Sequence, residues 1–198
     1  MRSQLVLLAL LTGCTTVTPQ IDPNLEQRAL AGDMQAQYAI GKQYVDARYS
    51  LRGKDEHWDG AVKWFALAAD QGDPRAQYYL GLHAANVMRN YEPALEFYQS
   101  AAMQGIAEAQ YALGMLYGQA WGTEQNLVLA YKWIALANRG GVVGGPLADT
   151  DWLVWKAGMN NSQIAEGKEL VAEHVATYGE SQSLRNLGTS PEYTSPAE

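Results

Sequence analysis

The strongest constraint on the fold is an Ala-Gln-Tyr triplet that occurs three times in the chain. The copies begin at Ala36, Ala76 and Ala109, so they are offset by 40 and 33 residues. In every copy one glycine lies four residues before the Ala and another lies three residues after the Tyr. Agreement at this many positions indicates an internal duplication with a unit of 33 to 40 residues.

A second block recurs with the same rhythm and predicts a second helix in each unit. It consists of Ala, an aromatic pair or Trp-Ile, and further Ala at intervals of three and four residues, and it begins at Ala61, Ala94 and Ala130. Such intervals place side chains on one face of an α-helix. Alanine in this stripe lets two helices approach closely, while the aromatic side chain fills the space beside it.

The residues after each second block predict tight turns between units. The blocks are closed by Gly72, Gly105 and Gly140, where we expect helices to end in a left-handed residue. Asp33 and Asp73 are expected to cap the following helices, and Pro74 suits a first helical position. Ile106 breaks this pattern in the third unit.

These motifs resemble Sel1-like repeats (SLR), which are relatives of tetratricopeptide repeats. The resemblance covers about residues 24 to 140 and includes the segment from Gly122 to Asn126, where Asn126 is expected to cap a helix. It implies an all-α fold, a right-handed α-solenoid of helix-turn-helix repeats, in which stacking of neighbouring units buries the core. The expected repeats are 33–72, 73–105 and 106–140, with a helix over 24–31 before them and a degenerate cap over 146–179. Pro146 is expected to open a helix to about Lys156, and Asn160 with Gln163 fits a capping box.

The N-terminus resembles a bacterial lipoprotein signal. Arg2 precedes a short apolar run that ends in Leu11-Thr12-Gly13-Cys14, and the run is too short to span a bilayer. An ordinary secretory peptide with a coincidental cysteine is the alternative. The lipoprotein resemblance implies lipid on Cys14, and Thr15 in place of Asp implies the outer membrane, facing the periplasm. The expected limits are 1–13 for the signal peptide, 14–23 for a tether, 24–179 for the solenoid and 180–198 for a disordered tail.

Composition and motif content argue against several classes of function. The net charge of −7 disfavours nucleic acid, whose phosphates need clustered Lys and Arg. The chain has no Gly-x-Ser-x-Gly, phosphate-binding glycine loop or His-Glu-x-x-His motif. Nothing in the sequence brings the three histidines, His57, His83 and His174, together. We therefore expect no catalytic residue, cofactor or metal site, and no enzyme.

Aromatic side chains that do not recur are the better candidates for binding a partner. Equivalent rings such as Tyr38, Tyr78 and Tyr111 are expected to pack, because each repeat needs the same interlock. The first repeat contains extra residues between Arg48 and Trp58, and insertions in repeat proteins often serve binding. Either these residues form a tolerated loop or they bind a partner. The candidate partner-binding residues are Tyr49, Arg52, Trp58 and Trp121.

The family resemblance implies a scaffold that recruits a periplasmic protein or peptide, with the membrane reached through the lipid on Cys14. The concave face formed by the first helices of the repeats is the alternative surface to the insertion. The alternative function is binding of cell wall or polysaccharide, or an envelope enzyme, because exposed Trp and Tyr can stack on sugars. The identity of the partner and the oligomeric state do not follow from the sequence.

Overall fold

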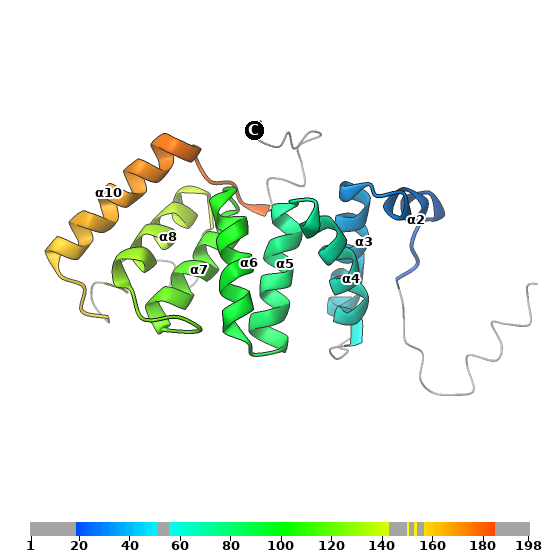
Figure 1. The fold of residues 1–198 in the computed structure, drawn as a ribbon, viewed down its shortest axis with the longest axis horizontal. Coiled ribbons are helices and arrows are strands. Elements are labelled where there is room, and N and C mark those ends of the chain that lie inside the picture. The colour runs from blue at the N-terminus through cyan, green and yellow to red at the C-terminus, as the bar shows by residue number, and fades with distance from the viewer. Residues whose placement is uncertain (1–18, 51–55, 143–149, 151–152, 154–156, 185–198) are drawn as a thin grey trace, which may run out of the picture. The chain divides into compact units, whose positions relative to one another are not determined.

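The computed structural model describes residues 19–50, 56–142, 150, 153 and 157–184 (Figure 1). Within this described part every regular element is a helix, apart from one isolated β-bridge. The chain divides into two compact units, one ending at Trp64 and the other beginning at Phe65. The fold is the all-α solenoid of repeats that the sequence predicts.

The N-terminal unit contains α2 (Pro23–Leu30), α3 (Met34–Ser50) and the beginning of α4 (Glu56–Asp70). The Asp22 carboxylate caps α2 by accepting hydrogen bonds from the next backbone amides at 2.9 and 3.0 Å. The small core of this unit is formed by Ala29, Ala36 and Ile40, against which Leu25 and Tyr44 pack. The helix expected over residues 24–31 is therefore confirmed as α2, and it covers α3.

The C-terminal unit continues with two helical hairpins and a final helix, in which α6 packs on α5, α7 on α6, α8 on α7 and α10 on α8 (Figure 1). Its elements after α4 are α5 (Pro74–Leu82), the π-helix η2 (His83–Val87), α6 (Tyr91–Met103), α7 (Ala107–Gln119), α8 (Leu127–Arg139) and α10 (Asn161–Tyr178). Asn160 and Gln163 form the expected capping box of α10. The Asn126 side chain caps α8 as predicted, accepting from the Leu129 amide at 3.0 Å.

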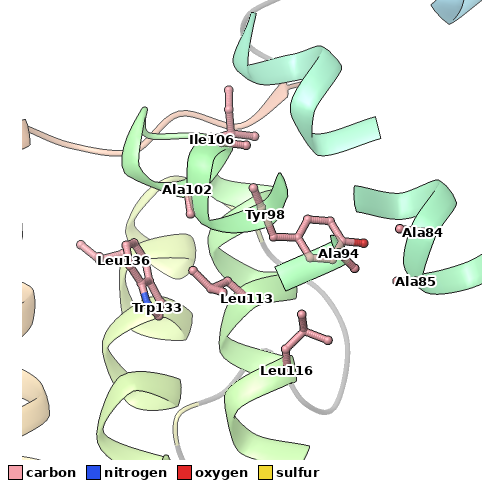
Figure 2. Packing of buried hydrophobic residues seen from close by; sticks show 12 residues of the cluster. Ala84, Ala85, Ala94, Tyr98, Ala102, Ile106, Leu113, Leu116, Trp133 and Leu136 are labelled. Carbon is pink, nitrogen blue, oxygen red and sulfur yellow. The ribbon is translucent and has the colours of Figure 1, made fainter. Parts of the chain in front are cut away.

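The main core joins α6, α7 and α8 and follows the predicted pattern of small and large side chains (Figure 2). Fully buried alanines such as Ala94 and Ala102 bring the helix backbones together, and Tyr98, Leu113 and Trp133 fill the space between them. Complete burial of one such large side chain contributes about 1.5–3 kcal/mol. The stripes recognised in the sequence therefore form the interfaces between neighbouring helices.

Two glycines of the repeat lie at close helix contacts, as their recurrence predicts. A Cβ at Gly114 would lie 2.7 Å from Ile134 Cγ1 and 3.1 Å from the Ala130 carbonyl oxygen on α8. A Cβ at Gly81 would lie 2.6 Å from two ring carbons of Tyr98 on α6. Neither position has room for a side chain without movement of its neighbour.

The helix caps and left-handed residues occur where the sequence predicts them in the first two repeats, whereas the left-handed residue that ends the third repeat does not. Asp73 caps α5 by accepting from the amides of Arg75 and Ala76 at 2.9 and 3.2 Å, and Asp33 caps α3 in the same way. Gly72 and Gly105 are left-handed, with φ of +93° and +86°. The same expectation for Gly140 was wrong, because its φ is −73° and Gly141 is the left-handed residue. Gly140 serves a close approach, since a Cβ there would lie 2.6 Å from Cβ of Ala107.

Residues 180–184, here called the C-terminal strap, explain why Ile106 departs from the repeat. The strap returns from the end of α10 and forms a parallel β-bridge between Gln182 and Ile106 (Figure 1). The Ala107 amide donates to the Gln182 carbonyl at 3.0 Å, and the Gln182 amide donates to the Gly105 carbonyl at 2.8 Å. A backbone carbonyl thus replaces the Asp cap of the other repeats, and Ile106 is buried in the core.

The strap corrects the expected start of the disordered tail at residue 180. Ser181 and Ser183 are buried, and Leu184 packs against the main core. Glu180 forms an ion pair with Arg139 at the end of α8. This hydrogen-bonded pair lowers the pKa of the Glu180 carboxyl and raises the pKa of the Arg139 guanidinium.

The connection in the first repeat is shorter than the sequence suggests. The expected loop from Arg48 to Trp58 is helical at both ends, because α3 continues to Ser50 and α4 begins at Glu56. The signal peptide, Cys14, most of the helix expected from Pro146 to Lys156, and residues 185–198 lie outside the described part of the chain.

Candidate partner-binding groove

A groove of about 470 Å³ is lined by side chains of α5, η2, α6 and α7 in the C-terminal unit. Five aromatic side chains line it, those of Tyr78, Tyr91, Tyr98, Tyr111 and Trp121. The groove is thus built by the first helices of two successive repeats, together with the helix that separates them. We call it the aromatic groove.

One face of α7 forms the length of the aromatic groove. Glu108, Tyr111, Ala112 and Met115 all line it, and their spacing of three and four residues places them on one side of the helix. The opposite face carries Leu113 and Gly114, which are buried against α6 and α8. The helix therefore presents a core face and a groove face at once.

The end of the groove near Trp121 is held in a strained turn. Ala120 ends α7 in a left-handed conformation with φ of +57°, which is uncommon for a residue with a side chain. Trp121 stacks on Tyr91 with ring centroids 5.3 Å apart and an interplanar angle of 22°. Gly122 permits this approach, because a Cβ there would lie 2.6 Å from the Tyr91 backbone. Trp121 remains 44% exposed and is available to a ligand.

A wide helical turn shapes the same end from the other side. The π-helix η2 follows α5, and the Met88 amide donates to the His83 carbonyl at 3.1 Å across it. Arg89 then adopts a left-handed φ of +54° and lines the groove with an exposed side chain. Among the described residues, Arg89 and Ala120 are the non-glycine residues with positive φ. Backbone strain of this kind, like a π-helical turn, clusters at functional sites.

Glu108 marks the opposite end of the groove. It lies in the first turn of α7, where the helix dipole favours a negative charge. Its carboxylate accepts the Leu184 amide at 2.9 Å through each oxygen and also accepts the Ser183 hydroxyl. From Glu108 to Trp121 the helix rises about 20 Å at 1.5 Å per residue. The groove therefore has the acidic side chain of Glu108 at one end, and the cationic side chain of Arg89 also lines it.

Burial affects the titration of two tyrosines that line the groove. Burial raises the pKa of Tyr111, and burial together with the neighbouring Tyr78 raises the pKa of Tyr98. Tyr78 and Tyr98 lie with ring centroids 6.0 Å apart. A tyrosine ring packs as an apolar surface while its hydroxyl can donate a hydrogen bond.

The structure places the predicted binding residues unevenly. Trp121 is exposed and lines the groove, whereas the Trp58 side chain is only 4% exposed and so packs inside the protein. The side chains of Tyr49 and Arg52, and the lipidation candidate Cys14, lie outside the described part.

Sequence reasoning missed Tyr78 and Tyr111 because it assigned recurring rings to packing alone. Glu108 and Arg89 were also missed. The signal for Glu108 and Tyr111 was their spacing along α7, which leaves one helix face unmatched by the core pattern.

The described residues contain no group of three or more His, Cys, Asp or Glu that could hold a metal ion. Within the same residues, no helix has the length and apolar character needed to cross a membrane.

Comparison with known proteins agrees with the repeat architecture. The family model "Sel1 repeat" matches residues 59–73, 74–106 and 107–142. A solved structure of a Sel1 repeat protein from Oxalobacter formigenes is 31% identical, covers 67% of this chain and 96% of its own, and has a TM-score of 0.51. The chain belongs to the Sel1 repeat family. Sel1 repeat proteins are generally scaffolds for protein interaction, and their fold is generally non-catalytic.

A second solved structure shows the same fold in a longer Sel1 repeat protein. It is a protective antigen of uropathogenic Escherichia coli that displays an SLR fold, with a TM-score of 0.65 and 22% identity. The match covers 88% of this chain but 36% of the antigen, so the present chain spans about a third of that relative. No curated protein matches the sequence. The family model divides the repeats near residues 73 and 106, where the sequence motifs also divide them.

Proposed function

We propose that this Sel1 repeat protein is a periplasmic scaffold, anchored to the outer membrane by lipid on Cys14, that binds a segment of a protein partner in its aromatic groove. The observation that carries the proposal is the groove itself, which places five aromatic rings and two opposite charges on one surface. The anchor rests on the lipoprotein-like sequence that ends at Cys14.

The shape and chemistry of the groove favour a peptide segment. Tyr, Trp and Arg are the residue types most enriched among those that dominate binding energy at protein interfaces. The Trp121 and Tyr91 pair is fixed before binding, so little side-chain entropy is lost there. A groove about 20 Å long at α-helical rise accommodates roughly six residues of extended chain at about 3.3 Å each.

A site-specific crosslinking experiment tests the groove as the partner surface. A photoreactive amino acid at Ala112, in the groove, should capture a discrete protein partner in intact cells. The same group at Ser100, which is exposed on α6 and does not line the groove, is the matched control. Trp121→Ala should reduce capture through Ala112 by about tenfold or more if the ring is a binding anchor worth about 1.4 kcal/mol or more. Equal capture at both positions, insensitive to Trp121→Ala, contradicts the proposal.

One observation favours binding of a polysaccharide as the second candidate. The indole of Trp121 presents a large exposed aromatic surface, and such surfaces stack on sugar rings. Retention of the purified protein on isolated cell-wall sacculi, lost in Trp121→Ala, together with no protein captured through Ala112, selects this alternative.

A further inference from the structure

We propose that residues 185–198 of the same chain lie along the aromatic groove and that a partner must displace them. The inference rests on the proposed function of the groove and adds its regulation. It makes the C-terminal segment a tethered competitor for the site.

The described chain ends at one end of the groove. Leu184 packs against the main core and donates its amide to Glu108, which is itself a lining residue. Ser183 is buried beside it and donates its hydroxyl to the same carboxylate. The strap is also fixed upstream, because Gln182 is bridged to Ile106. The described chain therefore ends beside Glu108, at this end of the groove.

The remaining segment has a length that fits the groove. The groove extends about 20 Å from Glu108 to Trp121 at helical rise. Eight residues after Leu184, from Arg185 to Glu192, span about 25 Å as polyproline II at 3.1 Å per residue. The segment thus reaches the Trp121 end with residues to spare before its terminus at Glu198.

The segment also contains groups that an aromatic groove can bind. Aromatic-lined grooves bind proline-containing extended segments, because the backbone is preorganised and the rings pack on the prolines. Pro191 lies seven residues after Leu184, so in an extended chain it would reach the Trp121 end, about 22 Å away at 3.1 Å per residue.

The segment also carries charges opposite to those of the groove. Arg185 directly follows Leu184, whose amide Glu108 holds, and Glu192 would provide a carboxylate about 25 Å further along an extended chain. In the part of the chain that the structure describes, no carboxylate forms an ion pair with Arg89. A carboxylate at the Trp121 end would therefore provide this cation with a partner.

Tethering makes weak binding sufficient. A short flexible connection gives an effective concentration in the millimolar range. A segment that binds as a separate peptide with a dissociation constant of about 100 µM would then fill the groove about ten to one, and would weaken a competing partner about tenfold.

Paramagnetic relaxation in the full-length chain tests the contact directly. Cys14→Ser removes the only native thiol, and Ser195→Cys then accepts a nitroxide label. We expect broadening of the amide signals of Ala112 and Met115 and of the Trp121 indole, relative to a diamagnetic label at the same position. The matched control exchanges the charges of the segment, Arg185→Glu with Glu192→Arg, which preserves composition and length. This exchange should reduce the broadening, and an absence of broadening in the parent protein overturns the proposal.

A second measurement separates this inference from the function of the groove. A synthetic peptide of residues 185–198 should bind a chain that ends at residue 184, and Trp121→Ala should weaken that binding severalfold. Partner capture through Ala112 should increase in the shortened chain. If the peptide does not bind but capture through Ala112 persists and stays unchanged, the inference fails and the scaffold function stands. If Ala112 captures nothing in either chain while the peptide binds, the segment occupies the groove and the proposed function fails.

Discussion

Replacement of Gly114 by Ala offers a sharp test of the helix packing, because two effects of known sign oppose each other. Ala favours a helix interior over Gly by about 0.8–1.0 kcal/mol. Against this, the new Cβ would meet Ile134 Cγ1 at 2.7 Å and the Ala130 oxygen and Ile134 nitrogen at 3.1 Å. Two of these three atoms belong to the backbone of α8 and cannot rotate away. Overpacking costs about 1–3 kcal/mol, so after the gain in helix propensity we expect a net loss of up to about 2 kcal/mol.

Urea and thermal unfolding followed by circular dichroism measure this loss. A loss of 1 kcal/mol lowers the melting temperature of a chain this size by about 2–4 °C. Gly81→Ala is the comparison, because its obstruction is the ring of Tyr98, a side chain. In a Tyr98→Ala background, Gly81→Ala should become stabilising, whereas in an Ile134→Ala background Gly114→Ala should still destabilise. If Gly114→Ala stabilises the protein by about 0.8–1.0 kcal/mol, the gain in helix propensity is unopposed and the close approach of α7 and α8 is refuted.

Three further perturbations test other parts of the protein. Cys14→Ser should shift the protein from the membrane fraction to the soluble fraction or leave it uncleaved, and an unlipidated, soluble parent protein on fractionation would disprove the anchor. Glu108→Ala should speed hydrogen exchange at the Leu184 amide and lower the free energy of unfolding by about 1–2 kcal/mol, because it removes hydrogen bonds to a charged group. Glu108→Gln keeps an acceptor and should lower the free energy of unfolding less. Burial and the Lys132 charge lower the pKa of His174, so the unfolded chain binds a proton at this residue more readily than the folded chain does. The free energy of unfolding should therefore fall as the pH drops below 6.5, the ordinary pKa of histidine. His174→Phe should flatten that part of the urea-midpoint profile, and an unchanged slope would exclude His174 as its cause.

The repeat helices and their caps could be predicted because they depend on contacts close in sequence. Asp73, Asn126 and Asn160 each cap a helix through amides two or three residues away, and the sequence shows both partners together. The recurring glycines likewise mark close contacts that repeat from unit to unit. These parts of the fold require only local spacing and the packing of neighbouring helices.

The groove and the strap could not be predicted from the same spacing. Recurrence of Tyr78 and Tyr111 favoured packing, but a half-buried ring at a repeat position can pack on one side and line a groove on the other. Trp58 was selected because it does not recur, yet its side chain is buried. The contact between Leu184 and Glu108 joins residues that are 76 positions apart in the sequence, and local spacing does not predict such a contact.

The strap changes how the end of the array can come apart. In a repeat protein each unit contacts only its neighbours, so terminal helices open first and independently. Here the residues that follow α10 are attached two helices back, at the start of α7. Within the described structure, α8 and α10 therefore lie inside a closed loop of about 75 residues. If these two helices detach from α7 while the bridge to Ile106 remains, the strap still holds them near the start of α7. Native-state hydrogen exchange should therefore show α7, α8 and α10 opening together, as one block, where an unlinked array would fray helix by helix.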